Sequence, residues 1–119
     1  MEKLNLAEKF GRFDDLWSPK IIGELNDYHL KLVKVKGEFV WHTHEDTDEF
    51  FLVVSGRLRI RLRDREVQLE EGEIFVVPRG VEHLPVADQE AHLLLLEPKG
   101  TVNTGDTLSE RTVPSEERI

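Results

Sequence analysis

The sequence predicts an all-β domain in which an antiparallel sheet closes into a sandwich or a barrel. Three observations support this: short β-type runs, turn signals between them, and no intervening segment long enough for a crossover helix. Because parallel neighbours need long crossover connections, adjacent strands are expected to be antiparallel. The runs lie between about Tyr28 and Glu97 and read KLVKVK, EFVWHTH, EFFLVV, RLRIRLR, REVQLE, EIFVV and HLLLLE.

The 119 residues are expected to form one domain, with a barrel core over about residues 28–98. The N-terminal segment, residues 1–27, contains NLAEKFGRF. There Asn5 can cap a short helix of one or two turns, and Gly11 weakens its continuation. The polar segment 101–119 is predicted to be either a loosely ordered tail or an arm lying on a neighbouring molecule.

Composition and charge exclude several classes of protein. Hydrophobic residues make up 39% of the chain and charged residues 34%, which is typical of an ordinary soluble protein. A formal net charge of −8 argues against nucleic acid or an anionic membrane as a partner. The chain has no cysteine, so it offers neither a disulfide nor a thiolate metal ligand. Without a signal-peptide pattern or an apolar run of about 18 residues, we expect a cytoplasmic location.

The stretch RLRIRLRDREVQLE is predicted to form a hairpin. Four arginines alternate with Leu58, Ile60 and Leu62 at a strict period of two. A loop at Asp64-Arg65 sets Leu62 opposite Val67 and Ile60 opposite Leu69, and sets Arg63 opposite Glu66 and Arg59 opposite Glu70. Because glutamates face the arginines, we interpret this stripe as ion pairs on an outer face rather than as an anion-binding surface.

A two-residue turn at Ser55-Gly56 is predicted to pair the preceding strand with this hairpin. It sets Val53 against Leu58, Phe51 against Ile60 and Glu49 against Leu62, so that Glu49 begins a row facing the interior. The alternate residues of the same strand are also apolar, which indicates that something covers its outer face. These outward residues are Phe50, Leu52 and Val54.

Four polar side chains are candidate metal ligands. His42 and His44 are two residues apart, so on a strand they point to the same face, with Trp41 and Thr43 on the other. Glu49 follows after a short acidic loop, and His83 follows a turn through Gly80. A histidine pair alone is more often two ordinary polar residues, and a lone Glu49 is more often a solvated acid. Together, three imidazoles and a carboxylate facing an apolar cavity are best satisfied by a divalent cation.

These residues resemble the two sequence motifs of the cupin superfamily. The first motif reads Gly37, His42-Thr43-His44, Glu49 and Gly56, and the second reads Gly72, Pro78-Arg79-Gly80 and His83. The resemblance covers about Lys34 to Glu97 and implies an antiparallel jelly-roll barrel, the double-stranded β-helix. It also implies that His42, His44, Glu49 and His83 bind the metal.

Two positions depart from the cupin pattern. Gly37 stands one residue closer to His42 than usual, and Ala87 occupies a position that is often Asn. The stretch EPKGTVNTGD resembles a subgroup of one-domain bacterial cupins, some of which are named mannose-6-phosphate-isomerase-like. The same family commonly forms homodimers across the sheet that carries the site, which favours a homodimer covering Phe50 and Leu52; the alternative cover is the chain's own N-terminal segment.

A site of this composition suits Mn, Fe, Ni, Cu or Zn and leaves two octahedral positions open for water, dioxygen or a small chelating anion. We therefore expect a metal-dependent enzyme, an oxygenase or an isomerase, acting on a small oxygen-rich anionic molecule. The alternatives are a non-catalytic module that binds a small molecule, a sugar or a metal, and a barrel with a structural metal. The sequence offers no catalytic general base, and His29 and His92 lack motif spacing and are expected to be structural or surface residues.

Overall fold

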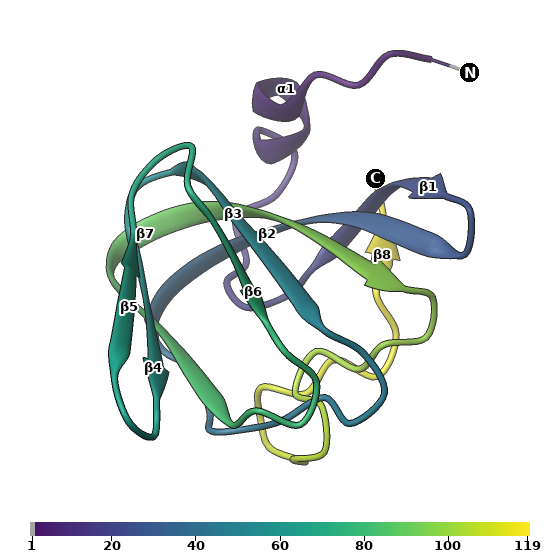
Figure 1. Cartoon of the computed structure of the whole chain (residues 1–119). Coiled ribbons are helices and arrows are strands. Elements are labelled where there is room, and N and C mark those ends of the chain that lie inside the picture. The colour runs from purple at the N-terminus through teal and green to yellow at the C-terminus, as the bar shows by residue number, and fades with distance from the viewer. Residues whose placement is uncertain (1) are drawn as a thin grey trace.

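The computed structural model describes residues 2–119 and shows a β-barrel with a short helix outside it (Figure 1). This confirms the predicted all-β fold and the short N-terminal helix. The elements, in chain order, are α1 (Leu6–Phe10), β1 (Lys20–Leu25), β2 (Tyr28–Glu38), β3 (Glu49–Ser55), β4 (Leu58–Leu62), β5 (Glu66–Leu69), β6 (Ile74–Val77), β7 (His83–Pro98) and β8 (Glu117–Arg118).

The long strand β7 connects the parts of the barrel. One of its edges pairs with β2 along most of its length. On its other edge, the first residues pair with β4 and the later residues pair with β3. The outer strands β5 and β6 pair with β4 and β3 respectively. All these pairings are antiparallel, as predicted, and the exception among the described strands is a short parallel pairing of β1 with β8.

Alternation along the strands places one row of side chains in the core. In β3 the inward residues Glu49, Phe51 and Val53 are buried, and the residues between them are half-buried. The second half of β7 alternates in the same way. Its inward row is Ala91, Leu93, Leu95 and Glu97. The sequence-based assignment of faces in β3 is therefore confirmed.

The predicted pairing of β3 with β4 is wrong. Both strands instead pair with β7, and the chain passes from one half of β7 to the other at Gly56. Gly56 has φ +87°, and a Cβ there would lie 2.9 Å from the carbonyl oxygen of Glu90. Glycine therefore allows the chain to turn closely over β7, and the turn does not close a two-residue hairpin. Period-two patterns determine which face is buried but not which strand is the partner.

The β4–β5 hairpin forms, but its register differs from the prediction by two residues. Ile60 lies opposite Val67 and Arg61 opposite Glu66, which makes the loop longer than Asp64-Arg65. A shift of two keeps the same residues on the inner face, so Leu58 and Ile60 are still fully buried. Arg57, Arg59 and Arg63 form ion pairs with nearby acids, as interpreted from the sequence, although Arg59 contacts Glu66 and Asp88 rather than Glu70.

The two terminal segments fold against the barrel. Asn5 caps α1 as predicted, because its side chain accepts a hydrogen bond of 2.9 Å from Glu8 N. Phe10 and Phe13 pack with Leu32 and partly cover Val54. Residues 101–119 are not a loose tail: Thr104 is fully buried, and β8 lies beside β1 at the C-terminus (Figure 1). No helix within residues 2–119 is long and apolar enough to cross a membrane.

Candidate metal centre

The four predicted ligand residues come together at one end of the barrel. Glu49 and His83 are the first residues of β3 and β7, and His42 and His44 lie in the connection between β2 and β3. The predicted strand EFVWHTH is not continuous there, but His42 pairs with His83 through two backbone hydrogen bonds of 3.0 and 3.1 Å. One ligand atom from each residue lies within 4.8 Å of the others, and all four residues are buried.

A single carboxylate oxygen lies among the three imidazoles. Glu49 Oε2 is 2.7 Å from His44 Nε2, 2.9 Å from His83 Nε2 and 3.8 Å from His42 Nε2. Burial by itself would raise the pKa of Glu49, but the close approach of the three imidazoles holds this pKa well below its ordinary value. Burial would lower the pKa of His44, and the contact with Glu49 overcomes this effect and raises it. Both pKa shifts favour an ionised Glu49 carboxylate beside a protonated His44.

The backbone orients the imidazole rings for metal binding. His42 Nδ1 lies 2.9 Å from Val40 O, and His83 Nδ1 lies 2.9 Å from Val81 O. Because a carbonyl oxygen only accepts, both Nδ1 atoms carry the proton, and in the neutral rings the Nε2 lone pairs point toward Glu49. The Nε2 atoms of His42 and His44 are buried and make no hydrogen bond within residues 2–119. A divalent ion would satisfy these atoms, so the residues fit a metal.

The C-terminal loop, residues 101–107, fastens the segment that carries the two histidines. Asp106 Oδ1 accepts a hydrogen bond of 3.0 Å from Thr43 N, and Asp106 N donates one of 3.1 Å to Thr43 O. The hydrogen bond from Thr43 also lowers the pKa of Asp106. Gly105 packs so tightly on Thr43 that a Cβ would lie 2.9 Å from the carbonyl carbon and closer still to the oxygen. Thr43 stands between His42 and His44, so the loop holds both ligands from outside.

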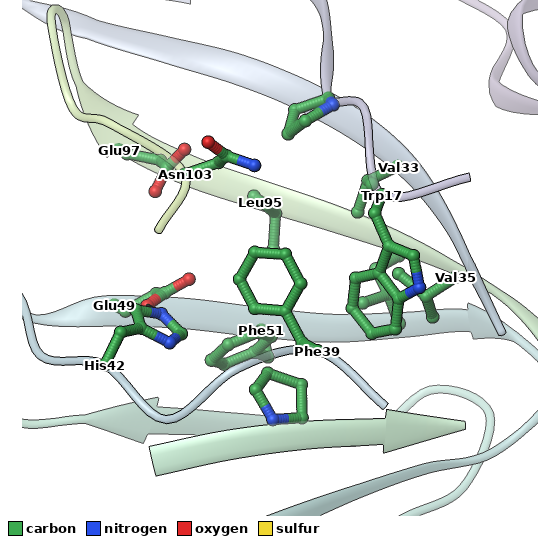
Figure 2. A pocket seen from close by; sticks show the side chains of 13 residues that line it. Trp17, Val33, Val35, Phe39, His42, Glu49, Phe51, Leu95, Glu97 and Asn103 are labelled. Atoms are coloured by element: carbon green, nitrogen blue, oxygen red, sulfur yellow. Dashed lines mark ion pairs between the residues drawn. The ribbon is translucent and has the colours of Figure 1, made fainter. Parts of the chain in front are cut away.

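A cavity of about 40 Å³ lies next to the candidate metal group. Its walls are mostly apolar, as expected from the inward row of β3. Figure 2 shows the polar residues His42, Glu49, Glu97 and Asn103 at one end and Trp17 at the other. The apolar part of the wall is formed by Trp17, Pro19, Val33, Val35, Phe39, Phe51, Pro85, Leu93 and Leu95. A molecule in this cavity would meet polar groups only near the candidate metal site.

Glu97 is a buried acid of this cavity that the sequence-based reasoning missed. It is 2% exposed, and its Oε1 lies 2.9 Å from Lys31 Nζ. Lys31 is fully buried and also contacts Glu116. Burial, together with the negative charge of Glu49, raises the pKa of Glu97 to about 7. The signal was present in HLLLLE, because Glu97 continues the inward row of Leu93 and Leu95.

The remaining histidines lie outside the metal group, as expected, and so do the two tryptophans. His92 stacks on Phe10 and contacts Glu90, and His29 lies beside Glu24. Trp17 belongs to the buried core, and Trp41 packs beneath the guanidinium of Arg63. These contacts are structural and place no further imidazole at the site.

The fold and the site together define a small β-barrel protein with a candidate metal centre of three histidines and one glutamate. The chain belongs to the cupin family, because the Cupin domain family model matches residues 29–97. A cupin-2 domain containing protein from Shewanella frigidimarina has a similar solved structure, with a TM-score of 0.80 and 51% identity over 81% of this chain and 94% of that chain. The cupin membership predicted from the motifs is thereby confirmed.

Two curated relatives are similar over part of their length. The uncharacterized protein YdbB of Bacillus subtilis is 38% identical over 63 residues, which cover 52% of this chain and 56% of YdbB. A protein named 3-hydroxyanthranilate 3,4-dioxygenase 2 from Aspergillus fumigatus is 30% identical over 91 residues, which cover 71% of this chain and 47% of the relative. This chain therefore spans about half the length of the curated relatives it matches.

Proposed function

We propose that this cupin is a metal-dependent oxygenase that acts on a small, largely apolar molecule carrying a metal-binding oxygen. The observation that carries the proposal is the cluster of His42, His44, Glu49 and His83, of which His42 and Glu49 line the polar end of a cavity with apolar walls. The similarity to a relative named as a dioxygenase agrees with this class of reaction. A cytoplasmic location remains a prediction from the sequence.

The cavity wall favours the oxygenase over the isomerase of the sequence-based expectation. A sugar carries hydroxyl groups on most of its carbons, and each buried hydroxyl needs a hydrogen-bond partner. Among the lining residues of the described chain there is no lysine or arginine to receive a phosphate, and most of the wall is aliphatic or aromatic. The predicted mannose-6-phosphate-isomerase-like subgroup therefore remains a resemblance of sequence.

One set of residues would bind the metal, and another set would exclude water from the substrate. The four ligands would hold a divalent Mn, Fe, Ni, Cu or Zn ion, and the carbonyl oxygens of Val40 and Val81 would keep two imidazoles oriented. When bound, the ion would supply Lewis-acid chemistry and, for a redox-active metal, dioxygen chemistry at its remaining positions. Phe39, Phe51 and Leu95 would exclude water from the substrate.

Metal analysis tests the first part of this proposal. The purified wild type is expected to hold about one divalent transition metal per chain. The variants His44→Ala and His83→Ala should lose most of it, and the control His92→Ala should keep it because His92 lies outside the site. Full metal content in both site variants would refute the assignment.

Oxygen consumption tests the second part. Protein loaded separately with Mn, Fe, Ni, Cu and Zn is screened against hydroxylated aromatic compounds, enols and sugar acids in an oxygen electrode. We expect steady uptake with a redox-active metal and a hydroxylated, mostly apolar compound, and none with His83→Ala. Turnover of sugar acids without oxygen uptake would instead support the isomerase.

A non-catalytic binding module is the second candidate, and the small volume of the cavity favours it. The cavity of about 40 Å³ is small, and all four ligand residues are buried. A module of this kind would bind a chelating small molecule in its metal form without consuming oxygen or changing the molecule. Binding by calorimetry together with an unchanged ligand by mass spectrometry would establish it.

We also propose that the chain is a homodimer through the outer face of β3 and β6. Phe50 lies opposite Val76 and Leu52 opposite Ile74, so the four apolar side chains share this face. Ile74 is 55% exposed and Val76 47% exposed, although α1 and the N-terminal segment cover the neighbouring Val54. A contiguous exposed apolar patch of this kind is typical of an interaction surface.

A further inference from the structure

Glu97 lies in the cavity wall but is not one of the four candidate metal ligands. Its side chain is 3% exposed and shares the polar end of the cavity with His42 and Glu49 (Figure 2). The ion pair with Lys31 is close, at 2.9 Å, but poorly aligned, and Glu97 Oε1 makes no hydrogen bond within the described chain. A strong acceptor is therefore buried at the cavity without a well-oriented donor.

Among the described residues, the buried group around Glu97 contains more carboxyl groups than ammonium groups. Lys31 Nζ lies between the buried carboxylate of Glu97 and the half-buried carboxylate of Glu116. Burying a carboxylate without a full set of hydrogen-bond donors costs free energy. A residue that only stabilises the fold would not need a carboxylate at this position. The raised pKa of Glu97 reflects this cost.

We propose that Glu97 is the second anchoring point of the cavity, where its carboxylate accepts a hydrogen bond from a hydroxyl or amino group of the ligand. The neighbouring oxygen of the same ligand would bind the metal held by His42, His44, Glu49 and His83. This inference rests on the proposed function of the site. It makes Glu97 a specificity-determining residue for ligands that carry a donor next to their metal-binding oxygen.

The cavity also defines the rest of such a ligand. Beyond its polar end the wall is apolar, from Phe51 and Leu95 to Trp17 (Figure 2). The ligand class is therefore a small molecule with two adjacent polar groups at one end, of which one binds metal and one donates to Glu97, and an apolar remainder. A ligand without the donor would leave the Glu97 carboxylate buried and unsatisfied, which lowers its affinity.

Two hydroxamic acids provide a matched pair of probes. Acetohydroxamic acid and N-methylacetohydroxamic acid both chelate a metal through two oxygens, but only the first has an N–H donor beside the metal-binding oxygen. Binding to the Zn form of the protein is measured by calorimetry. A hydrogen bond to a charged group is typically worth about tenfold or more in affinity, so we expect the wild type to prefer acetohydroxamic acid by about tenfold.

Variants identify Glu97 as the source of this preference. In Glu97→Gln the preference should fall to within about threefold, because the neutral amide is a weaker acceptor. Zn content should stay at the wild-type level, since the four ligands are intact. The matched control is Glu116→Gln, which removes a carboxylate from the same lysine but does not line the cavity, and it should keep the preference. If Glu97→Gln does not fold, Glu97→Asp, which retracts the carboxylate by one methylene, should show the same loss.

The outcomes separate the inference from the proposed function. A preference that persists in Glu97→Gln is steric and overturns the inference, as does a wild type that binds both probes equally. In both cases Zn and hydroxamate binding would leave the metal site itself supported. A wild type that holds no Zn or binds neither probe would overturn the proposed function and the inference with it.

Discussion

Replacing Gly105 by alanine is expected to weaken metal binding while the barrel remains folded. Gly105 has φ +58° and packs on the backbone of Thr43, where a Cβ would overlap the carbonyl oxygen. Contacts of a Cβ below 3.0 Å are essentially never found, so the C-terminal loop or Thr43 must move. Because Thr43 lies between His42 and His44, its displacement moves the two imidazoles relative to Glu49 and His83.

The size of the effect follows from the tolerance of metal coordination. Ligand distances in metal sites vary by about 0.2 Å, and the overlap at Thr43 O requires a larger movement than this. Loss of a partner that supports a metal ligand typically lowers metal affinity by about 10- to 100-fold, and we expect Gly105→Ala in this range. The left-handed backbone adds about 1–2 kcal/mol of strain, which lowers the stability of the apoprotein as well.

The control Gly100→Ala separates strain from displacement of the ligands. Gly100 also has a positive φ, +86°, but a Cβ there would meet no atom within 4 Å. Both variants should lower the melting temperature of the apoprotein, measured by circular dichroism with a chelator. Only Gly105→Ala should weaken Zn binding, measured by competition with a chromophoric chelator. Equal Zn affinities of the two variants would refute the role of the C-terminal loop in positioning the histidines.

Three further predictions concern metal, pH and assembly. Removing the metal with a chelator should lower the melting temperature by a term set by metal affinity and concentration, while the far-ultraviolet β-sheet signal persists at 25 °C; an apoprotein without that signal would contradict a barrel that folds by itself. Burial raises the pKa of Glu97 from 4.5 to about 7 in the folded apoprotein, so between these pH values the folded state holds a proton that the unfolded state has lost. The free energy of unfolding therefore falls as the pH rises from about 4.5 to 7. Denaturant unfolding of Glu97→Gln should therefore lose less stability than the wild type between pH 5 and 8, by up to about 3 kcal/mol, and parallel pH profiles would argue against the shift. Light scattering should give the wild type twice its chain mass of 13.8 kDa, Leu52→Glu should be monomeric, and the exposed control Leu108→Glu should remain dimeric; a monomeric wild type would contradict the homodimer.

Much of the fold and the membership of the candidate site could be predicted from the sequence, because both depend on local patterns. Alternation in EFFLVV indicated that Glu49 and Phe51 face the interior, and both are buried. The spacing of His42 and His44 with the later His83 indicated one group, and the four side chains lie together. The first residues of β3 and β7 and the connection before β3 bring these residues to one end of the barrel, so the site formed although the strand predicted over EFVWHTH is not continuous.

The partner of each strand could not be predicted in this way. A period of two is the same for every possible neighbour, so the pattern was compatible with pairing of β3 and β4 as well as with the observed pairing of both to β7. The same ambiguity explains the two-residue shift in the β4–β5 hairpin. In both cases the error left the inner face unchanged, and the expected burial of Leu58 and Ile60 was correct.

The C-terminal segment was misjudged because its contribution is made mainly by polar contacts. Its composition resembles that of a loose tail, but Asp106 exchanges two hydrogen bonds with the backbone of Thr43, and Glu116 reaches the buried Lys31. These contacts are far apart in the segment and lead to different parts of the site. One fixes the histidine pair, and the other completes the charged group that contains Glu97. A segment whose loop holds the two histidine ligands belongs to the candidate site itself, and the Gly105→Ala experiment examines this contribution.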